Sequence, residues 1–593
     1  MIRSIRIPSL PRLSHHVASY LVALLLVALT ISGESSYASS EESDKDDFYE
    51  DYRKPAMRIR LNDPVYDQAE NIIEALFSWQ VHRTVIPTQQ QCFAEGCVSI
   101  FNFRISSFRP PTTILLQPRP PNLFDLNLEN FDLDIVGEVS GTLQVLNLPI
   151  PVTGRIIVNA RNIAVASDLE MQKTRNNVAF MKLSSCGMQS GFVDAKIVDM
   201  GLFTDTVNTK YRNEIVAKAK SLLESVLCDN VNKILKSEFN ARLAEMPRKI
   251  YVEDIAKGIL GLENETKRFK REEDAFVIKA LPADRSGVAT IKEITRKTSI
   301  RLQDAARATK LMNESSFFSP AKFEGLFIDL DMVDTSATKS EFTIGIDGAV
   351  LKEEAIQVDN IPYARPERIR FTKIQKKRML EVLISEYTLN SLFFQAYSYN
   401  ALRFHINGET PVLGPLLKTS CSLDEVCLSD SIDEAAEKYP DRQLELVVYP
   451  TKAPRITVHE DSADLRIKGI SEYFLADSGV QIGSIPFSAD VELRLHSKLS
   501  KIYGSIKIKR LEFHDPVDFF ELTVENLDGL RKATIGAVEN LARQKLETPI
   551  DLSEISRAKF ERFGIQNVTV KLLAQGAAMV QTDFDLYRTF YGK

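Results

Sequence analysis

Six cysteines and seven histidines are the residues of this chain best suited to redox, metal or nucleophilic chemistry. The cysteines form three sets: Cys92 with Cys97, Cys186 with Cys228, and Cys421 with Cys427. An even number of cysteines behind a secretion signal indicates disulfides. Zinc binding is the alternative, but the chain has no C-x-x-C motif and its histidines are scattered. We therefore predict three disulfides and no metal site.

The sequence offers no catalytic machinery. It has no G-x-S-x-G, H-E-x-x-H, P-loop or G-x-G-x-x-G motif. Gly137-Glu-Val-Ser-Gly141 places its serine one position late, and we expect a hairpin turn there. His459-Glu-Asp461 ends a predicted strand and should be exposed, whereas catalytic groups usually need burial to perturb their pKa. We predict a protein that is not an enzyme, with no catalytic residue and no cofactor.

The N-terminus has the features of a secretion signal. Arg3, Arg6 and Arg12 precede the apolar run at residues 21–29, and Ser36-Tyr-Ala38 fits a signal-peptidase site. An uncleaved anchor is the alternative, but the run is shorter than the roughly 20 residues that span a bilayer. We predict a signal peptide at residues 1–38, an acidic disordered segment at 39–54 and a secreted, extracellular protein.

Residues 247–320 interrupt the alternating patterns and are predicted to be a charged insertion or linker. Two of the three N-glycosylation sequons, Asn264 and Asn313, lie there, and the third is Asn567. The run from Arg268 to Arg271 resembles a proprotein-convertase site, and an ordinary solvated basic turn is the alternative.

The part before this linker, residues 55–246, combines helices with alternating strands. Asp63 is the expected N-cap of a first helix, with Pro64 at its first position. Alternating strands follow from Leu126 to Met171, and such strands have one buried face. A long amphipathic helix then runs from Ile215 to beyond Leu235. Such a helix needs a long curved sheet to pack against.

The second half repeats this order. Strands resume within residues 321–375, and residues 376–593 again give a helix, strands, a second amphipathic helix and a last strand. The simplest explanation is two copies of one α+β fold. The formal net charge of -6, with 26% charged residues, gives no basic stripe for nucleic acid, so we predict no nucleic-acid partner.

The chain resembles the family of bactericidal/permeability-increasing protein, lipopolysaccharide-binding protein and the cholesteryl ester and phospholipid transfer proteins. The resemblance covers roughly residues 55–245 and 322–590. It is carried by the strands from Leu123 to Met171, Ser184-Ser-Cys-Gly187, the long helix with Cys228, Leu243-Ala-Glu-Met-Pro247, Met379-Leu-Glu-Val-Leu-Ile-Ser-Glu-Tyr387 and Lys545-Leu-Glu-Thr-Pro-Ile550. Cys186 and Cys228 match the position of the disulfide that the family shares.

The resemblance implies a boomerang of two tubular domains, each a long helix wrapped by a twisted antiparallel sheet, joined by a central sheet within residues 321–375. Each tube would hold an apolar tunnel for lipid acyl chains, which gain about 0.8 kcal/mol per buried CH₂. The predicted lipid-contact residues are Ile72, Leu76, Leu222, Val226, Leu389 and Leu392. Ordinary core packing is the alternative for each of them.

The expected partner is a phospholipid-like lipid, with transient contact to a membrane or lipoprotein. Binding of bacterial lipopolysaccharide or another envelope lipid, as an innate-immune function, is the alternative. However, the hairpin from Val136 to Arg155 has one basic residue, Arg155, where endotoxin-binding relatives carry several. A third possibility is a structural or adhesive protein whose own side chains fill the tunnel.

Overall fold

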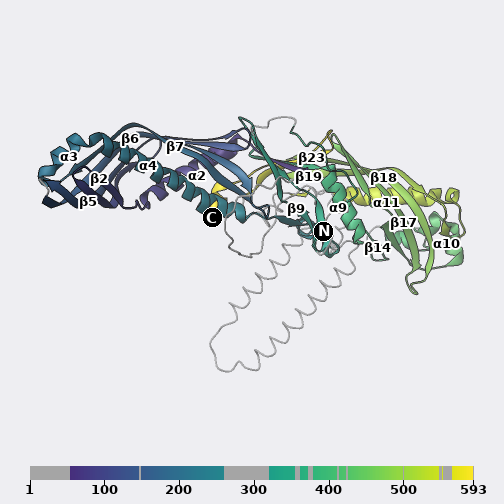
Figure 1. The fold of residues 1–593 in the computed structure, drawn as a ribbon. Helices are drawn as coiled ribbons and strands as arrows, with labels where there is room; N and C mark the ends of the chain where they lie inside the picture. Colours follow the sequence, from purple (N-terminus) through teal and green to yellow (C-terminus); the bar gives the residue numbers. More distant parts are fainter. Residues whose placement is uncertain are drawn as a thin grey trace, which may run out of the picture.

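The computed structural model describes residues 54–145, 148–259, 320–353, 361–371, 378–410, 413–422, 425–498, 500–546, 550–551 and 564–591. The signal peptide, the acidic segment up to residue 53, Asn264, Asn313 and the Arg268–Arg271 run lie outside these residues. The described chain is elongated, with its N-terminal half at one end, its C-terminal half at the other and a sheet between them (Figure 1). This arrangement confirms the predicted α+β fold of two curled antiparallel sheets joined by a central sheet.

The N-terminal sheet consists of long antiparallel strands that curl around two helices. Its strands are β2 (Gln89–Phe93), β3 (Gly96–Arg109), β4 (Thr113–Arg119), β5 (Leu123–Val145), β6 (Leu148–Lys173) and β7 (Ala179–Val198). The inward residues alternate along β5 and β6 and pack against α2 (Asp63–His82) and α4 (Arg212–Ile234). The N-cap of α2 is Asn62, one residue before the predicted Asp63.

Bulges let the two longest strands follow the curvature. The β5–β6 register shifts on both sides of Phe131, close to Asn130 and Asn162, whose φ angles are 56° and 51°. Asparagine tolerates this left-handed conformation better than most residues, and a bulge strengthens the local twist. The expected turn at Gly137–Gly141 is therefore wrong, because these residues lie inside β5.

The long helix continues past α4 through a π-helical segment (Leu235–Asn240) into α5 (Ala241–Ala244). A disulfide joins Cys186 on β7 to Cys228 on α4, with 5.9 Å between the Cα atoms. At the other end of this half, Cys92 and Cys97 join β2 to β3, and the segment η1 (Gly201–Phe203) leads into α3 (Thr204–Lys210). The Cys186–Cys228 disulfide therefore holds the long helix against the N-terminal sheet.

The central sheet takes strands from three distant parts of the chain. Its order is β10 (Met332–Ala337), β11 (Phe342–Ile346), β1 (Met57–Leu61), β13 (Leu380–Ser385), β23 (Ala577–Asp583) and β22 (Gln566–Leu573). Only β10 and β11 come from residues 321–375, where the sequence placed this sheet. The sequence did not indicate β1 at all.

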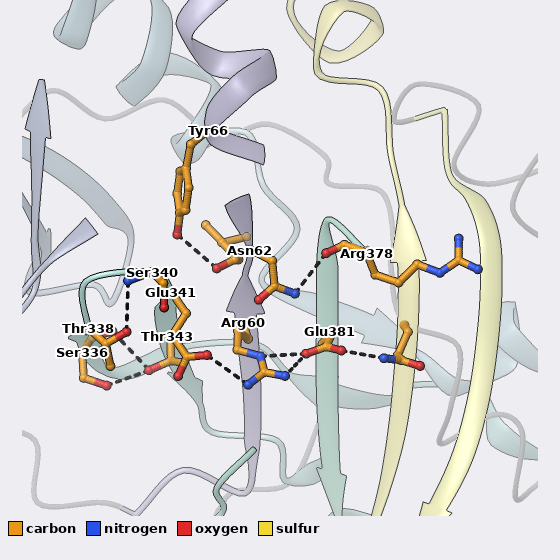
Figure 2. Close-up of polar contacts among 12 residues, drawn as sticks. Arg60, Asn62, Tyr66, Ser336, Thr338, Ser340, Glu341, Thr343, Arg378 and Glu381 are labelled. Carbon is orange, nitrogen blue, oxygen red and sulfur yellow. Dashed lines mark hydrogen bonds and ion pairs between the residues drawn. The ribbon is translucent and has the colours of Figure 1, made fainter. Parts of the chain in front are cut away.

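A buried ion pair fixes the register of this sheet (Figure 2). Arg60 on β1 lies opposite Glu381 on β13, and its Nε donates to a Glu381 carboxylate oxygen at 2.7 Å. The second Glu381 oxygen accepts from Gln581 on β23. Arg60 also donates to Glu341 at 3.0 Å, and its guanidinium lies 4.2 Å from the centre of the Phe371 ring. Arg60 is 1% and Glu381 0% exposed, so neither charge has water to replace a lost partner.

The C-terminal sheet repeats the N-terminal design. Its strands are β14 (Phe404–Ile406), β15 (Leu444–Pro450), β16 (Arg455–His459), β17 (Ser462–Leu475), β18 (Gln481–Lys498), β19 (Lys501–Phe513), β20 (Asp518–Phe519) and β21 (Ile550–Asp551). The helices α9 (Glu386–Ser398) and α11 (Asp528–Leu546) pack against β16 and β19. Smaller elements are η4 (Pro415–Leu417), η5 (Leu428–Asp430), α10 (Asp433–Lys438) and η6 (Val524–Leu527), and Cys421 pairs with Cys427 beside η5.

Part of the predicted linker belongs to the folded body. Within residues 247–320, Lys249–Tyr251 forms β8 and Val252–Ile259 forms α6. Strand β8 pairs with β9 (Leu326–Asp329), which pairs with β12 (Val350–Lys352). The short helices η3 (Pro320–Phe323) and α13 (Leu586–Tyr591) complete the described elements. Among the described residues, no helix is both long and apolar enough to cross a membrane.

Breaking the central ion pair should destabilise the whole protein. Replacing Arg60 by methionine leaves Glu381 buried without its cation, and we expect a loss of about 3–5 kcal/mol in unfolding free energy. Arg58→Met is the matched control, since the Asp334 side chain that Arg58 contacts is 42% exposed, and it should cost less than about 1 kcal/mol. Urea denaturation measures both, and equal losses would contradict the assigned role of Arg60.

The disulfides should contribute unequally. The Cys186–Cys228 bridge spans 42 residues and should contribute about 4 kcal/mol by constraining the unfolded chain. The Cys92–Cys97 bridge spans 5 residues and should contribute only about 2 kcal/mol. Thermal unfolding of the two double-serine variants tests this order. A larger loss for Cys92→Ser/Cys97→Ser would contradict it.

Candidate functional site

A cavity of about 510 Å³ lies where α2, the N-terminal sheet, the end of the long helix and the central sheet meet. Its wall is almost wholly apolar. The central sheet contributes Met57, Ile59, Leu61, Ile344, Ile346, Leu380, Val382, Val568, Val580 and Thr582. Helix α2 and strands β4–β7 contribute Val65, Ala69, Ile72, Ile73, Phe77, Leu116, Phe124, Leu126, Leu128, Leu169, Met171 and Met181. A continuous apolar lining of this size suits a large apolar ligand.

The register of the central sheet determines which residues reach the cavity. Ile59 lies opposite Val382, and Leu61 lies opposite Leu380, so these side chains share one face of the sheet. Arg60 and Glu381, one position along each strand, point to the other face. A slip of one residue would exchange the two faces and bring the ion pair into the cavity.

The polar groups inside the cavity already have protein partners. Tyr66 donates its hydroxyl to the Leu61 carbonyl at 3.0 Å, and burial raises the pKa of Tyr66 well above its usual range. The Thr582 hydroxyl donates to the Gln566 carbonyl at 2.8 Å. The interior therefore offers hydrocarbon contact rather than hydrogen bonds, and it selects for the apolar part of a ligand.

The cavity opens near the end of the long helix. Two residues of its lining are about half exposed there: Met246 at 46%, and Arg248, whose side chain is 47% exposed. Arg248 donates to Asp331 at 2.6 Å, and Asn177 of the β6–β7 hairpin donates to the same carboxylate at 2.9 Å. Arg242 pairs with Glu238 at 2.9 Å. Each arginine of this opening thus has its own carboxylate.

Helix α13 closes part of this opening. Leu586, Thr589 and Phe590 line the cavity, and Phe590 packs edge-on against Phe239 with 5.0 Å between ring centres. The Phe590 carbonyl accepts from Arg242 at 2.7 Å, and the Leu586 amide donates to the Gln68 side chain on α2 at 3.1 Å. The last described helix of the chain is therefore part of the wall of the N-terminal cavity.

The six predicted lipid-contact residues lie in four different places. Ile72 lines the cavity. Leu76 packs in the core of the N-terminal half, and Leu389 and Leu392 pack in the core shared by the central and C-terminal sheets. Leu222 and Val226 line a separate pocket of about 200 Å³, between α4 and residues 84–89, which also contains lysines and serines. Lipid contact at all six positions, including Ile72, remains a prediction.

The other predicted sites are placed as follows. Asn567 is exposed on β22 and donates to Asp583 at 3.0 Å, and its glycosylation remains a prediction. His459 is about half exposed, and its Nε2 lies 3.5 Å from an Asp464 carboxylate oxygen. Arg155, the one basic residue of the 136–155 hairpin, is paired with Asp199 at 2.5 Å.

Sequence reasoning missed most of the cavity wall. The central strands showed the alternation of apolar and polar residues expected of strands, for example at Phe342, Ile344 and Ile346. This alternation does not reveal that strands from three separate parts of the chain form one wall of the cavity. Helix α13 was missed because its apolar residues, Leu586 and Phe590, occupy less than two turns. The spacing of four residues between them was the only available signal.

Comparisons with known proteins found one family model and several solved structures that are similar to this chain. The family model "LBP / BPI / CETP family, C-terminal domain" matches residues 327–575. The crystal structure of a lipopolysaccharide binding protein aligns with 90% of this chain and 99% of its own, at 14% identity and a TM-score of 0.43. Takeout 1 of Epiphyas postvittana aligns with 30% of this chain and 94% of its own, at 13% identity and a TM-score of 0.21. No curated protein matches the chain.

Filling the cavity should weaken the binding of apolar compounds. Ile344→Trp adds a large side chain on the cavity face of β11, and we expect an apolar fluorescent probe to bind at least several-fold more weakly. Ser336→Trp is the control, because Ser336 is exposed on the neighbouring strand β10. Fluorescence titration measures both affinities. Unchanged probe binding by Ile344→Trp would mean that the probe does not use this cavity.

Proposed function

Because the chain belongs to the LBP/BPI/CETP family of lipid-binding proteins, with residues 327–575 matching its C-terminal domain, we propose that it is a secreted carrier of phospholipid-like lipids. The observation that carries this proposal is the apolar cavity between α2 and the central sheet. Acyl chains would lie inside it, with the headgroup at the opening beside Met246 and Arg248. The protein acts by binding, without a chemical step.

The energetics of the cavity favour acyl chains over polar ligands. Each CH₂ group moved from water into the cavity gains about 0.8 kcal/mol. A polar group placed there finds Tyr66 and Thr582 already bonded to backbone carbonyls, so it would lose its water without a replacement partner. The headgroup must therefore remain at the opening.

The charge balance at the opening favours neutral or zwitterionic headgroups. Arg242 and Arg248 each face a protein carboxylate, Glu238 and Asp331. A multiply phosphorylated glycolipid would have to displace these carboxylates and would be repelled by them. Arg155, the one basic residue of the hairpin from Val136 to Arg155, is paired with Asp199. Lipopolysaccharide binding is therefore the less favoured alternative.

Mass spectrometry of lipid extracted from the purified protein tests the proposal directly. We expect two-chain lipids with neutral or zwitterionic headgroups in the wild type, and less of them in Ile344→Trp. Extraction of no lipid from a folded wild-type protein, together with no uptake from phosphatidylcholine vesicles, would refute the carrier function.

Salt dependence separates the two lipid classes. Phosphatidylcholine binding should change by less than about twofold between low and high salt, because Arg242 and Arg248 at the described opening are each paired with a carboxylate. Lipopolysaccharide binding through phosphates would instead weaken steeply as salt rises. Tight, salt-sensitive binding of lipopolysaccharide in the same titration would favour the innate-immune alternative.

A further inference from the structure

Helix α13 has two faces with different surroundings. Leu586, Thr589 and Phe590 line the cavity on one side. Tyr587 and Tyr591 lie on the other side, 43% and 48% exposed, with their rings stacked 6.3 Å apart between centres. The helix therefore separates the cavity interior from the outside at the point where the cavity opens.

Met246, at the end of the long helix, is a further exposed residue at the cavity opening. It lines the same cavity and is 46% exposed. We call the exposed parts of Met246, Tyr587 and Tyr591 the rim patch. Tyrosine suits the boundary between water and lipid, since its ring is apolar and its hydroxyl can remain hydrated.

We propose that the rim patch docks the protein onto the surface of a lipid bilayer, where the cavity opening exchanges its contents with the membrane. This inference rests on the proposed carrier function. The basis of the proposal is that the rim patch is continuous with the cavity lining. Met246 itself lines the cavity, and Tyr587 and Tyr591 directly follow the lining residues Leu586 and Phe590 in the sequence. Docking at this point would let an acyl chain pass between membrane and cavity without crossing water, which is the costly alternative.

The charges around the rim patch fit a zwitterionic surface. Arg242 donates to Glu238 and to the Phe590 carbonyl, and Arg248 donates to Asp331. Contact with the membrane would therefore depend on apolar and aromatic side chains and would not need anionic lipid. A second copy of this chain could also cover such a patch, and the test below distinguishes that outcome.

The test compares the full-length double variant Tyr587→Ser/Tyr591→Ser with the wild type in flotation with phosphatidylcholine vesicles. We expect vesicle association at least about tenfold weaker, because two aromatic side chains lose their contact with lipid. The rate of transfer of a self-quenched fluorescent phospholipid between vesicles should fall with it. Met246→Ser should weaken both measurements in the same direction.

Two control variants locate the effect. Tyr399→Ser removes a tyrosine that is similarly exposed, at 45%, in the C-terminal half. Leu202→Ser removes the 96% exposed leucine of η1 near the distal end of the N-terminal half. Neither should reduce vesicle association. A loss with Leu202→Ser and none with the double variant would overturn the proposal by moving docking to the distal end.

Failure of rim-patch docking can be distinguished from failure of the carrier function. Wild-type protein that retains lipid but whose vesicle association is unaffected by the double variant refutes rim-patch docking alone. A change of oligomeric state in the double variant, with vesicle association intact, would assign the patch to a second copy of the chain and also refute it. An unchanged melting temperature and an unchanged amount of retained lipid in the double variant exclude simple misfolding.

Discussion

The ion pair between Arg60 and Glu381 is the interaction on which the rest of this structure depends. Together with Gln581, it aligns strands β1, β13 and β23, which come from the beginning, middle and end of the described chain. That alignment places Ile59, Leu61 and Val382 on the cavity face and keeps the charges on the other. A buried ion pair is a poor source of net stability but a strong penalty on wrong pairing. We infer that its role here is to specify register.

The same register connects the two halves. The N-terminal sheet supplies one wall of the cavity, and the central sheet, which also borders the C-terminal core, supplies the opposite wall. The Cys186–Cys228 bridge holds the long helix against the N-terminal wall. The cavity therefore lies between the N-terminal sheet and the central sheet. Its shape depends on how these two sheets pack against each other.

Local patterns were enough to predict much of the fold. The helical stripe from Ile215 to Leu235, the alternation along β5 and β6 and the repetition of this order all depend on neighbouring residues. Nothing local marked Arg60 as buried, since its partner is 321 positions away. An apolar stripe on a helix likewise indicates that this face is shielded from water, but it does not show whether packed side chains or a cavity lie against it. Leu389 faces packed side chains and Ile72 faces a cavity, although their helices have the same periodicity.

The position of α13 has a consequence for biosynthesis. A chain made from its N-terminus completes α2 and the N-terminal sheet several hundred residues before Phe590 exists. During that interval the cavity lacks both its central strands β22 and β23 and its closing helix. The nascent protein therefore exposes an incomplete apolar cavity wall while the rest of the chain is being made. Assembly of the last strands and binding of an apolar molecule then become competing ways to cover this wall. Under the carrier function proposed above, a lipid would assist folding before it is carried.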